Sequence, residues 1–384
     1  MALDAVRPID RTELVPLLEA PHRIAAREVR ARIDVPLADR AAMDGYAVRA
    51  NETAGASDER PVSLRLRELV YAGRAPTRRV ARGTCSEVAT GSLLPPSADA
   101  VVNVERTDRD GDVVRVRAAV SPGESVSPRG EDIVRGTTLV RPGDPLTPGK
   151  IGALAAVGTS GVRVFARPRV AVLTTGNEVV RPGAAIRRDQ VYDVNSRTLA
   201  AVIRDHGGEP RIRGPVRDEI AALRETVRKA SSASDLVVVS GGSSVGARDL
   251  LVDVLDEVLF HGVAIRPGRP TILGRVRGVV VLGMPGYPTS CLTIAYVFLG
   301  PMVRRIARRP PAVERTVDLP LAERLESPEG KVEIHPVRVE RGLAVSSFKK
   351  SSAITSMADA DGYIVIPADV RVVDAGARVR VILF

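Results

Sequence analysis

The sequence predicts a multi-domain fold: a doubly wound, largely parallel α/β domain flanked by a β-rich N-terminal region and a C-terminal β-barrel-like domain. The chain has 384 residues, which is too long for one compact core. Residues 168–308 alternate short apolar runs with helical patterns, which is typical of parallel strands joined by helices. Residues 46–145 and 310–384 contain short runs of alternating apolar and polar residues, which indicate half-buried strands.

These patterns divide the chain into three parts. Residues 1–165 are expected to form an N-terminal region, in which an extended segment carries an inserted β-rich domain at about 46–145. Residues 166–309 are expected to form the α/β domain, and residues 310–384 the C-terminal β domain.

Two helices are expected in the N-terminal region. The first follows the candidate caps Asp10 and Thr12, and its apolar stripe contains Leu14, Leu17 and Leu18. The second begins at Thr147-Pro148 and runs to about residue 157, before a glycine.

The composition is that of an ordinary soluble globular protein, with 44% hydrophobic and 27% charged residues. No apolar run approaches the length of a bilayer-spanning helix, and the N-terminus lacks a signal-peptide pattern, so a cytoplasmic location is the default expectation. Cys85 and Cys291 lie in unrelated contexts and indicate neither a disulfide framework nor a zinc site.

The net charge of +10 raises the question of a nucleic-acid partner. The basic residues are spread along the chain, and only 6 Tyr, 5 Phe and no Trp are available to stack on bases. Of the 56 basic residues only 5 are Lys, so 51 are Arg. We therefore expect no nucleic acid and no membrane as partners, and favour a basic pocket for a small phosphorylated or oxyanion ligand.

The stretch Asp235–Asp249 has the pattern of a strand, a glycine-rich loop and a helix. The β-branched run Leu236–Val239 reads as a buried strand, and the loop that follows contains Gly241, Gly242, Ser243 and Gly246. A helix is expected from near Asp249, with apolar residues at 250, 251, 254, 255 and 258. Such a loop can present N–H groups to an anion, but it can equally be a plain tight turn.

Three strands of the predicted sheet end in small, polar or glycine-rich sequences: Thr174–Glu178, Ser240–Gly246 and Gly283–Ser290. Ligands of open α/β sheets bind beyond the carboxyl ends of the strands. The coincidence of three such ends predicts a pocket there.

Several charged residues lie near these ends. Glu178, Asp218 and Asp249 are acidic, and Arg266 and Arg269 stand in an Arg-Pro-Gly-Arg-Pro sequence. Carboxylates and guanidiniums around one crevice suit a phosphorylated ligand with Mg²⁺. Taken singly, Asp218 is an N-cap for a helix through residue 230, and Asp249 can be one too. Similarly, Asn195 or Ser196 can cap the helix that follows them.

The combination of motifs is more specific than any one of them. Six motifs occur in a fixed order before a Pro-Gly-x-Pro sequence at 285–288. They are Ala42-Met-Asp-Gly-Tyr-Ala47, Thr90-Gly91, Arg129-Gly-Glu-Asp132, Thr175-Gly-Asn-Glu178, Tyr192-Asp193, and Ser240–Gly246 with Asp249. Over essentially the whole chain, this series resembles the molybdopterin molybdenumtransferase family, which includes bacterial MoeA and the E domain of animal gephyrin.

The resemblance implies a reaction and an assembly. Members of the family insert molybdate into adenylyl-molybdopterin with Mg²⁺, and release AMP and molybdenum cofactor. The subunit is elongated and forms a homodimer, whose cleft lies between the α/β domain of one subunit and the N-terminal domains of the other. The molybdopterin adenylyltransferase is a further candidate partner.

The resemblance also implies roles for individual residues. Asp44, Thr90 and Asp132, which by themselves read as turn or solvated residues, match catalytic residues of the N-terminal side. Glu178, Asp218 and Asp249 match the acidic group of the α/β domain, with Glu178 and Asp249 as metal ligands. The predicted cofactor-binding residues are Gly241, Gly242, Ser243, Gly246, Asn195 and Ser352.

Two departures from the family pattern bear on specificity. The family commonly has Lys where this chain has Arg266 and Arg269, the predicted oxyanion-binding residues, and commonly has Asn where this chain has Tyr287. A planar guanidinium is not equivalent to a compact ammonium. A tungstate-preferring paralogue, and a non-catalytic molybdopterin-binding or scaffold protein, are therefore alternatives. A nucleotidyltransferase that adenylates molybdopterin fits less well, because the flanking β domains and the Ala-Met-Asp-Gly-Tyr motif have no place in it.

Overall fold

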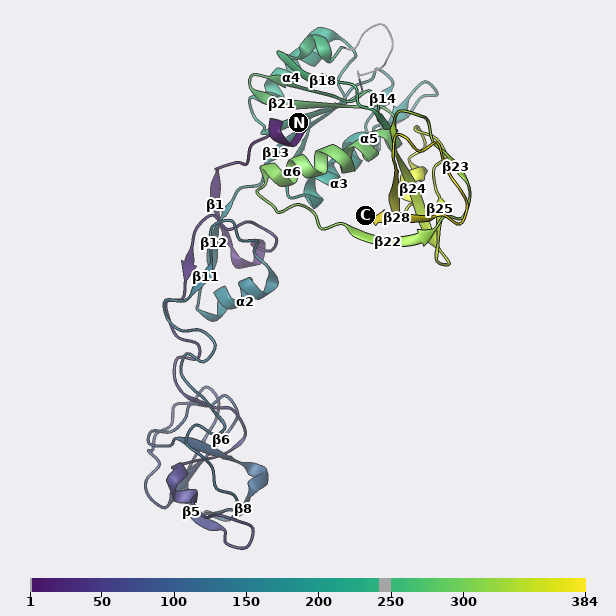
Figure 1. Ribbon diagram of the computed structural model, residues 1–384. Coiled ribbons are helices and arrows are strands. Elements are labelled where there is room, and N and C mark those ends of the chain that lie inside the picture. The colour runs from purple at the N-terminus through teal and green to yellow at the C-terminus, as the bar shows by residue number, and fades with distance from the viewer. Residues whose placement is uncertain (1, 242–249) are drawn as a thin grey trace. The chain divides into compact units, whose positions relative to one another are not determined.

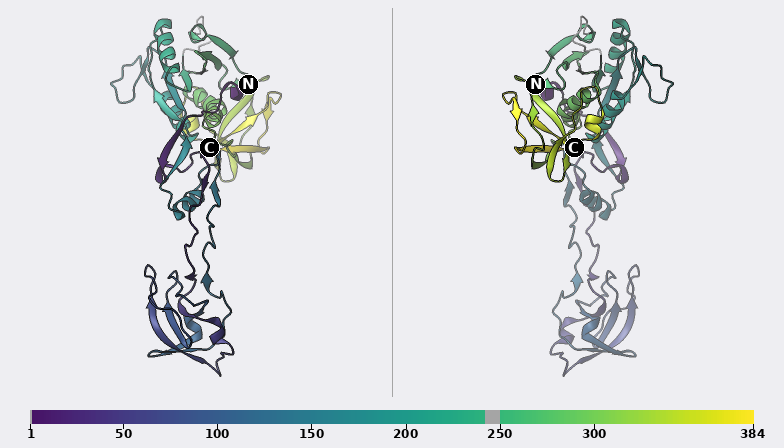
Figure 2. Two further views of the ribbon diagram at one scale, coloured as in Figure 1. Left: turned by 90° about the vertical axis from the view of Figure 1, so that its left-hand side faces the viewer. Right: turned by 90° about the vertical axis from the view of Figure 1, so that its right-hand side faces the viewer.

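The computed structural model describes residues 2–241 and 250–384 (Figures 1 and 2). The chain forms two compact units. The larger unit comprises Met1–Glu13, His22–Ile24 and Arg163–Phe384, and the smaller unit comprises Leu14–Pro21 and Ala25–Val162. Within the described residues, no helix has the length and apolar character needed to cross a membrane.

A six-stranded sheet forms the centre of the α/β part of the larger unit, in the order β16-β13-β17-β21-β20-β18. The first four strands in this order run parallel, and β20 and β18 are antiparallel to their neighbours. The strands are β13 (Arg169–Thr174), β16 (Glu209–Ile212), β17 (Leu236–Ser240), β18 (Glu257–His261), β20 (Ile272–Val276) and β21 (Val279–Met284). The short strands β14 (Val179–Val180) and β15 (Val191–Tyr192) pair separately.

Helices cover both faces of this sheet. In β17, Leu236 and Val238 pack into one apolar cluster, while Val237 and Val239 pack into another, as expected for a strand buried on both sides. The first cluster includes residues of α3 (Asn195–Asp205), α5 (Pro288–Ile294) and α6 (Gly300–Ile306), which lie together in Figure 1. The second includes α4 (Ile220–Ser231). A π-helical turn, η5 (Ala295–Leu299), joins α5 to α6.

The C-terminal strands form a second six-stranded sheet, in the order β19-β24-β26-β28-β22, with β25 also paired to β24. An isolated bridge between Leu321 and Ala344 links the end of β22 to β25, so five strands close into a ring. The strands are β19 (Ile265–Arg266), β22 (Arg315–Pro320), β24 (Val332–Glu340), β25 (Leu343–Ser346), β26 (Gly362–Ile366) and β28 (Arg378–Leu383). Strands β23 (Leu325–Glu326) and β27 (Val372–Val373) pair beside them, and α7 (Thr355–Ala358) precedes β26.

The smaller unit contains a third six-stranded sheet, in the order β7-β4-β6-β5-β9-β8. Its strands are β4 (Gly45–Val48), β5 (Val62–Val70), β6 (Thr84–Val88), β7 (Ala100–Asn103), β8 (Thr107–Asp110) and β9 (Val113–Val116). Two short ladders join β2 (Val29–Arg30) to β11 (Thr138–Val140) and β3 (Arg40–Ala41) to β10 (Val126–Ser127). Helix α2 (Pro148–Ala156) begins where the sequence predicted, with the Thr147 hydroxyl accepting from the Lys150 amide.

Two predicted helices are wrong. The N-terminal one is replaced by α1 (Ala2–Ala5), β1 (Thr12–Pro16) and η1 (Leu17–Glu19), and Leu18 is 95% exposed. Pro16 lacks an N–H group and cannot continue a helix beyond its first turn. The helix expected from near Asp249 is also wrong in its described part, because only the short turn η4 (Val252–Val254) forms before Val258 enters β18.

Candidate strand-end site

Asn195 joins the carboxyl ends of two parallel strands. Its Nδ2 donates to Ser240 Oγ at the end of β17 (2.8 Å) and to the Gly286 carbonyl after β21 (2.7 Å). Ser240 Oγ in turn donates to the Pro285 carbonyl (3.1 Å). The sequence predicted that these strand ends share an edge, and the hydrogen bonds bring them into direct contact.

The third strand end joins the same edge through backbone contacts. The Thr175 amide, just after β13, donates to the Ser240 carbonyl (2.9 Å), and the Gly241 amide donates to the Met284 carbonyl (3.1 Å). Gly241 has φ +92°, and a Cβ there would lie 2.8 Å from the Thr175 carbonyl oxygen and hydroxyl. Only glycine fits this close crossing without displacing the Thr175 backbone.

Two buried polar atoms at this edge have no hydrogen-bond partner within the described part of the chain. They are Asn195 Oδ1 and Thr175 Oγ1, and both residues are buried. Buried acceptors and hydroxyls are almost always matched in native proteins, by a protein group, a water or a ligand. The two atoms therefore leave hydrogen-bonding capacity unused at the strand ends.

Asp193 connects α3 to the central sheet. The sequence indicated this residue only as part of the Tyr192-Asp193 motif and assigned it no role. Its carboxylate accepts from Thr174 Oγ1 (2.9 Å) and from the Ser196 amide (3.0 Å), so it ties the start of α3 to the end of β13. The prediction that Asn195 or Ser196 caps α3 is wrong, because Asp193 provides the acceptor and Asn195 points to the strand ends. An aspartate two residues before a helical pattern was the available signal.

Glu178 and Asp218 are both exposed near the end of β13. The Asp218 amide donates to Asn177 Oδ1 (3.3 Å), which connects the loop before α4 to the residue beside Glu178. The sequence predicted Asp218 as the N-cap of α4, and this is wrong. Glu219 occupies the N-cap position, and its side chain makes no capping hydrogen bond. Asp218 is therefore free of the capping role that explained it most simply.

This pair of carboxylates is compatible with Mg²⁺. Magnesium prefers oxygen ligands, and commonly takes one or two protein carboxylates together with substrate phosphates. Among the described residues, no group of three or more His, Cys, Asp or Glu forms a closed protein site for a metal ion.

Arg266 and Arg269 lie in the loop that begins at β19. Both are exposed, and Arg269 makes no ion pair or side-chain hydrogen bond with the described residues. Arg266 lies 3.7 Å from Glu333 in the C-terminal sheet. Gly268 between them packs against Ile294, since a Cβ there would lie 2.4 Å from the Ile294 side chain, so the loop is seated on α5.

Ser352 is exposed on a loop that is anchored to the start of α5. The Thr289 amide donates to the Ser351 carbonyl (3.0 Å), and the Thr289 hydroxyl donates to the Ala353 carbonyl (2.7 Å). The Pro-Gly-Tyr-Pro motif immediately before Thr289 is thereby joined to the Ser352 loop. Tyr287 itself is 63% exposed.

The predicted residues of the smaller unit are placed on two segments. Asp44 Oδ1 accepts from the Thr90 amide (2.6 Å) and from Thr90 Oγ1 (2.8 Å). These bonds, first the one from the amide and then the one from the hydroxyl, hold the pKa of Asp44 below its ordinary value. Asp132 lies on another segment, where its amide donates to the Val35 carbonyl (3.0 Å).

Gly242, Ser243, Gly246 and Asp249 lie outside the described residues. The predicted phosphate cradle and the second predicted metal ligand therefore stay predictions. Of the four predicted loop residues Gly241, Gly242, Ser243 and Gly246, the described part of the chain includes Gly241. Its positive φ agrees with the start of a tight loop.

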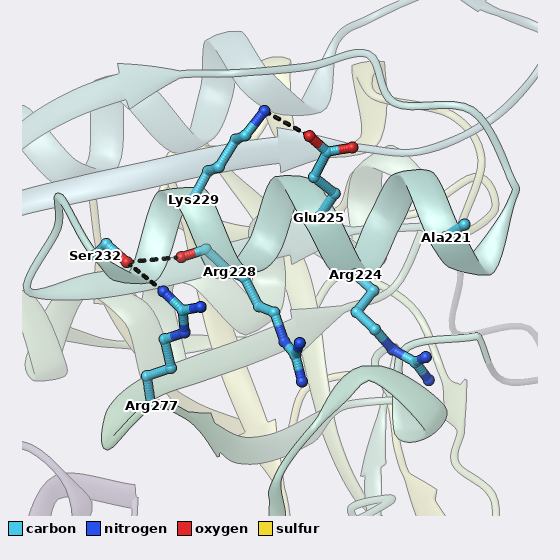
Figure 3. A pocket seen from close by; sticks show the side chains of 7 residues that line it. All are labelled: Ala221, Arg224, Glu225, Arg228, Lys229, Ser232 and Arg277. Carbon is cyan, nitrogen blue, oxygen red and sulfur yellow. Dashed lines mark hydrogen bonds and ion pairs between the residues drawn. The ribbon is translucent and has the colours of Figure 1, made fainter.

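A separate hollow of about 590 Å³ lies on the surface of α4 (Figure 3). It is lined by Ala221, Arg224, Glu225, Arg228, Lys229, Ser232 and Arg277. Figure 3 shows Arg224 and Arg228 pointing to one side of the helix, while Lys229 pairs with Glu225 on the other. None of the predicted site residues lines it, so this hollow is distinct from the strand-end site.

Comparison with known proteins covers the whole chain. Three family models match: the MoeA N-terminal region (domain I and II) over residues 1–158, a probable molybdopterin binding domain over residues 171–305, and the MoeA C-terminal region (domain IV) over residues 318–384. Molybdopterin molybdenumtransferase 2 of Mycobacterium tuberculosis is 34% identical, and the match covers 98% of this chain and 95% of that protein.

Other relatives agree. The molybdopterin molybdenumtransferase of Bacillus subtilis is 29% identical over 97% of this chain and 90% of its own. The solved structure of the molybdopterin biosynthesis moea protein from Pyrococcus horikosii superposes with a TM-score of 0.85 and 39% identity, over 100% of this chain and 97% of that one. The chain belongs to the molybdopterin molybdenumtransferase family, and it is a transferase of molybdenum cofactor biosynthesis.

Proposed function

We propose that this protein inserts molybdate into adenylyl-molybdopterin and releases AMP and molybdenum cofactor. The observation that carries the proposal is the set of hydrogen bonds from Asn195 to the ends of β17 and β21, beside two unpartnered buried polar atoms. A phosphorylated pterin would bind at this edge, where ligands of open parallel sheets bind.

The charged residues that the sequence singled out suit the other parts of the substrates. Arg266 and Arg269 offer planar N–H donors that would hold the oxygens of molybdate by charge-assisted hydrogen bonds. Glu178 and Asp218, with Asp249, would hold Mg²⁺ next to the phosphoanhydride. When bound, Mg²⁺ would neutralise the developing charge on the phosphate oxygens during hydrolysis.

The chain needs no nucleophile of its own for this reaction, because the dithiolene sulfurs of the pterin replace two oxygens of molybdate, which leave as water after protonation, while water hydrolyses the anhydride. The nearest thiol supports this. Cys291 is completely buried, 3.4 Å from Ser240 Oγ, and burial raises its pKa to about 12. A thiol that holds its proton at neutral pH is a packing residue, not an attacking group.

We further propose that the protein works as a cytoplasmic homodimer, to which Asp44, Thr90 and Asp132 contribute as catalytic residues. A chain of 40.9 kDa would then sediment with twice that mass. The molybdopterin adenylyltransferase, whose product is the substrate here, is the proposed partner in the preceding step.

The deciding experiment measures AMP release from adenylyl-molybdopterin at increasing concentrations of molybdate or tungstate. Release that depends on molybdate supports the proposed reaction, and release that depends on tungstate at lower concentrations supports the tungstate-preferring alternative. Equilibrium binding of AMP or molybdopterin with no turnover would instead favour a binding or scaffold protein.

A further inference from the structure

A buried pair of ionisable side chains lies in β24 of the C-terminal sheet. Glu333 is 4% exposed and His335 is 6% exposed, and His335 Nδ1 lies 3.2 Å from Glu333 Oε1. Burial of a carboxylate is costly unless its charge and its hydrogen-bonding capacity are matched. His335 is the hydrogen-bond partner of Oε1, so the partner of Oε2 has to be identified.

Glu333 Oε2 is buried and accepts no hydrogen bond within the described residues. It faces Arg266, whose guanidinium nitrogen lies 3.7 Å away. The contact follows from the backbone, because β19 and β24 pair in parallel with Arg266 opposite Glu333. Neighbouring residues in register present their side chains to the same face of a sheet, so Arg266 extends over the carboxylate.

The other end of the pair reaches the Ser352 loop. His335 Nε2 lies 2.8 Å from Ser346 Oγ, and Ser346 Oγ accepts from the Phe348 amide (3.3 Å). If Nδ1 carries the proton and donates to Glu333 Oε1, Nε2 accepts from the Ser346 hydroxyl, so both ring nitrogens of His335 have a partner. The two contacts hold the His335 ring between Glu333 and Ser346.

Beyond Phe348, the loop is held by Ser356. The Ser347 hydroxyl donates to the Ser356 carbonyl (2.8 Å), and the Lys349 amide donates to Ser356 Oγ (2.9 Å). The same loop then contacts the start of α5 through residues 351 and 353. One continuous set of polar contacts therefore runs from Arg266, through β24, to the loop that carries Ser352.

The charge state of Glu333 agrees with this arrangement. Burial acts to raise the pKa of Glu333, but His335, the nearby Ser327 hydroxyl and the charge of Arg266 outweigh it, so the pKa lies below its ordinary value. Glu333 is thus a carboxylate at neutral pH and attracts the guanidinium.

We propose that Glu333, His335 and Ser346 are positioning residues, which hold the Arg266 guanidinium and the Ser352 loop in place to receive the oxyanion substrate. This role rests on the proposed function of Arg266 as an oxyanion ligand. Arg266 has five N–H donors, and Glu333 attracts the guanidinium from one side only, which leaves the outer donors for molybdate. A flexible arginine without this contact would have to be ordered by the substrate itself.

The test is a double-mutant cycle between Glu333→Gln and Arg266→Ala, with two readouts on the full-length protein: the Kd of molybdate by calorimetry, and KM and kcat for AMP release. Glu333→Gln is expected to raise the Kd and KM for molybdate about tenfold, with kcat and the Kd of AMP within about twofold of wild type. In the Arg266→Ala background, Glu333→Gln is expected to change the molybdate Kd no further.

Glu340→Gln is the matched control, because Glu340 lies in the same strand but is exposed, and its one ion pair with a described residue is with Arg338 (3.1 Å). It should leave all constants unchanged. Ser346→Ala is a second variant in case Glu333→Gln is poorly folded, and it should raise the molybdate Kd when measured well below its melting temperature, which the loss of the His335 contact lowers. An unchanged or lower molybdate Kd in Glu333→Gln, or an effect that persists without Arg266, would overturn the proposal.

The two readouts separate this inference from the proposed function. If the wild-type protein binds molybdate through Arg266 but releases no AMP, the proposed reaction fails, while the binding cycle still decides the role of Glu333. If AMP release depends on molybdate and the cycle shows no coupling, the reaction stands and the positioning role is wrong.

Discussion

Asn195 Nδ2 donates to both Ser240 Oγ and the Gly286 carbonyl, so one amide group from α3 holds the ends of two parallel strands. The two acceptors lie 45 and 91 positions away in the sequence. Because the amide is buried, water cannot replace it in either bond. The arrangement of the strand-end site therefore depends on this side chain.

Replacing Asn195 by Leu, which has a similar size but no donor, is expected to destabilise the larger unit by about 1–3 kcal/mol, because two buried acceptors lose their partner. It should also weaken binding of molybdopterin, because the ends of β17 and β21 would lose the side chain that joins them. Urea unfolding followed by circular dichroism measures the first effect and ligand titration the second. Asn51→Leu, at an exposed position, should stay within about 0.5 kcal/mol of wild type; equal stability of the two variants would contradict the role of Asn195.

Glu178→Gln is expected to lower kcat for AMP release at least about 100-fold, because the amide cannot replace the carboxylate as a ligand to Mg²⁺. The fold should be unaffected, since Glu178 is exposed and its carboxylate makes no hydrogen bond or ion pair with the described residues. Titration of activity with Mg²⁺ after treatment with EDTA checks this, and the half-maximal concentration should rise in the variant. Glu225→Gln, an exposed acid on α4, is the control, and an unaltered Mg²⁺ requirement in Glu178→Gln would exclude it as a ligand.

The sequence allowed the strand ends of this site to be predicted, but not the contacts that organise it. The β-branched run before Ser240 and the glycines after it are local signals, and they place Gly241 correctly. The position of Asn195 opposite Ser240 and Gly286 depends on how α3 packs against the sheet, which no local pattern encodes. The position of Asp193 before α3 was a local signal for its contact with the Ser196 amide, but its contact with Thr174 on β13 depends on the same packing.

The pairing of Arg266 with Glu333 is even harder to predict from local sequence patterns. The two residues belong to different predicted domains, and they meet because β19 joins the C-terminal sheet instead of the α/β sheet. A two-residue strand followed by proline carries too little periodicity to reveal its partner. The helix expected at Val258 failed differently, because apolar residues at helical spacing also fit a short edge strand, and pairing with β20 decided the outcome.

The contact between Asp44 and Thr90 predicts a dependence on pH. Since the pKa of Asp44 is lowered, the stabilisation from its carboxylate is fully present above the unfolded pKa and is lost as the pH falls through the folded pKa. Thr90→Val removes the hydroxyl donor, so the pKa of Asp44 should move up toward its ordinary value. NMR titration of the carboxyl carbon measures the shift. The pKa of Asp34, lowered by the Arg135 amide and then by Arg129, is the internal reference and should not move; an unmoved Asp44 would show that the hydroxyl contributes nothing.

Gly241→Ala is expected to destabilise the larger unit by about 1–3 kcal/mol. The residue has φ +92°, and the new Cβ would lie 2.8 Å from two atoms of Thr175, so both the backbone conformation and the crossing of β13 and β17 would be strained. Gly152→Ala has the opposite expectation. Gly152 lies inside α2 with open space around its Cα, so alanine there should stabilise the smaller unit by about 0.5–1 kcal/mol. Urea unfolding of both variants measures these changes in the free energy of unfolding. A Gly241→Ala protein as stable as wild type would mean that the ends of β13, β17 and β21 can move apart without cost.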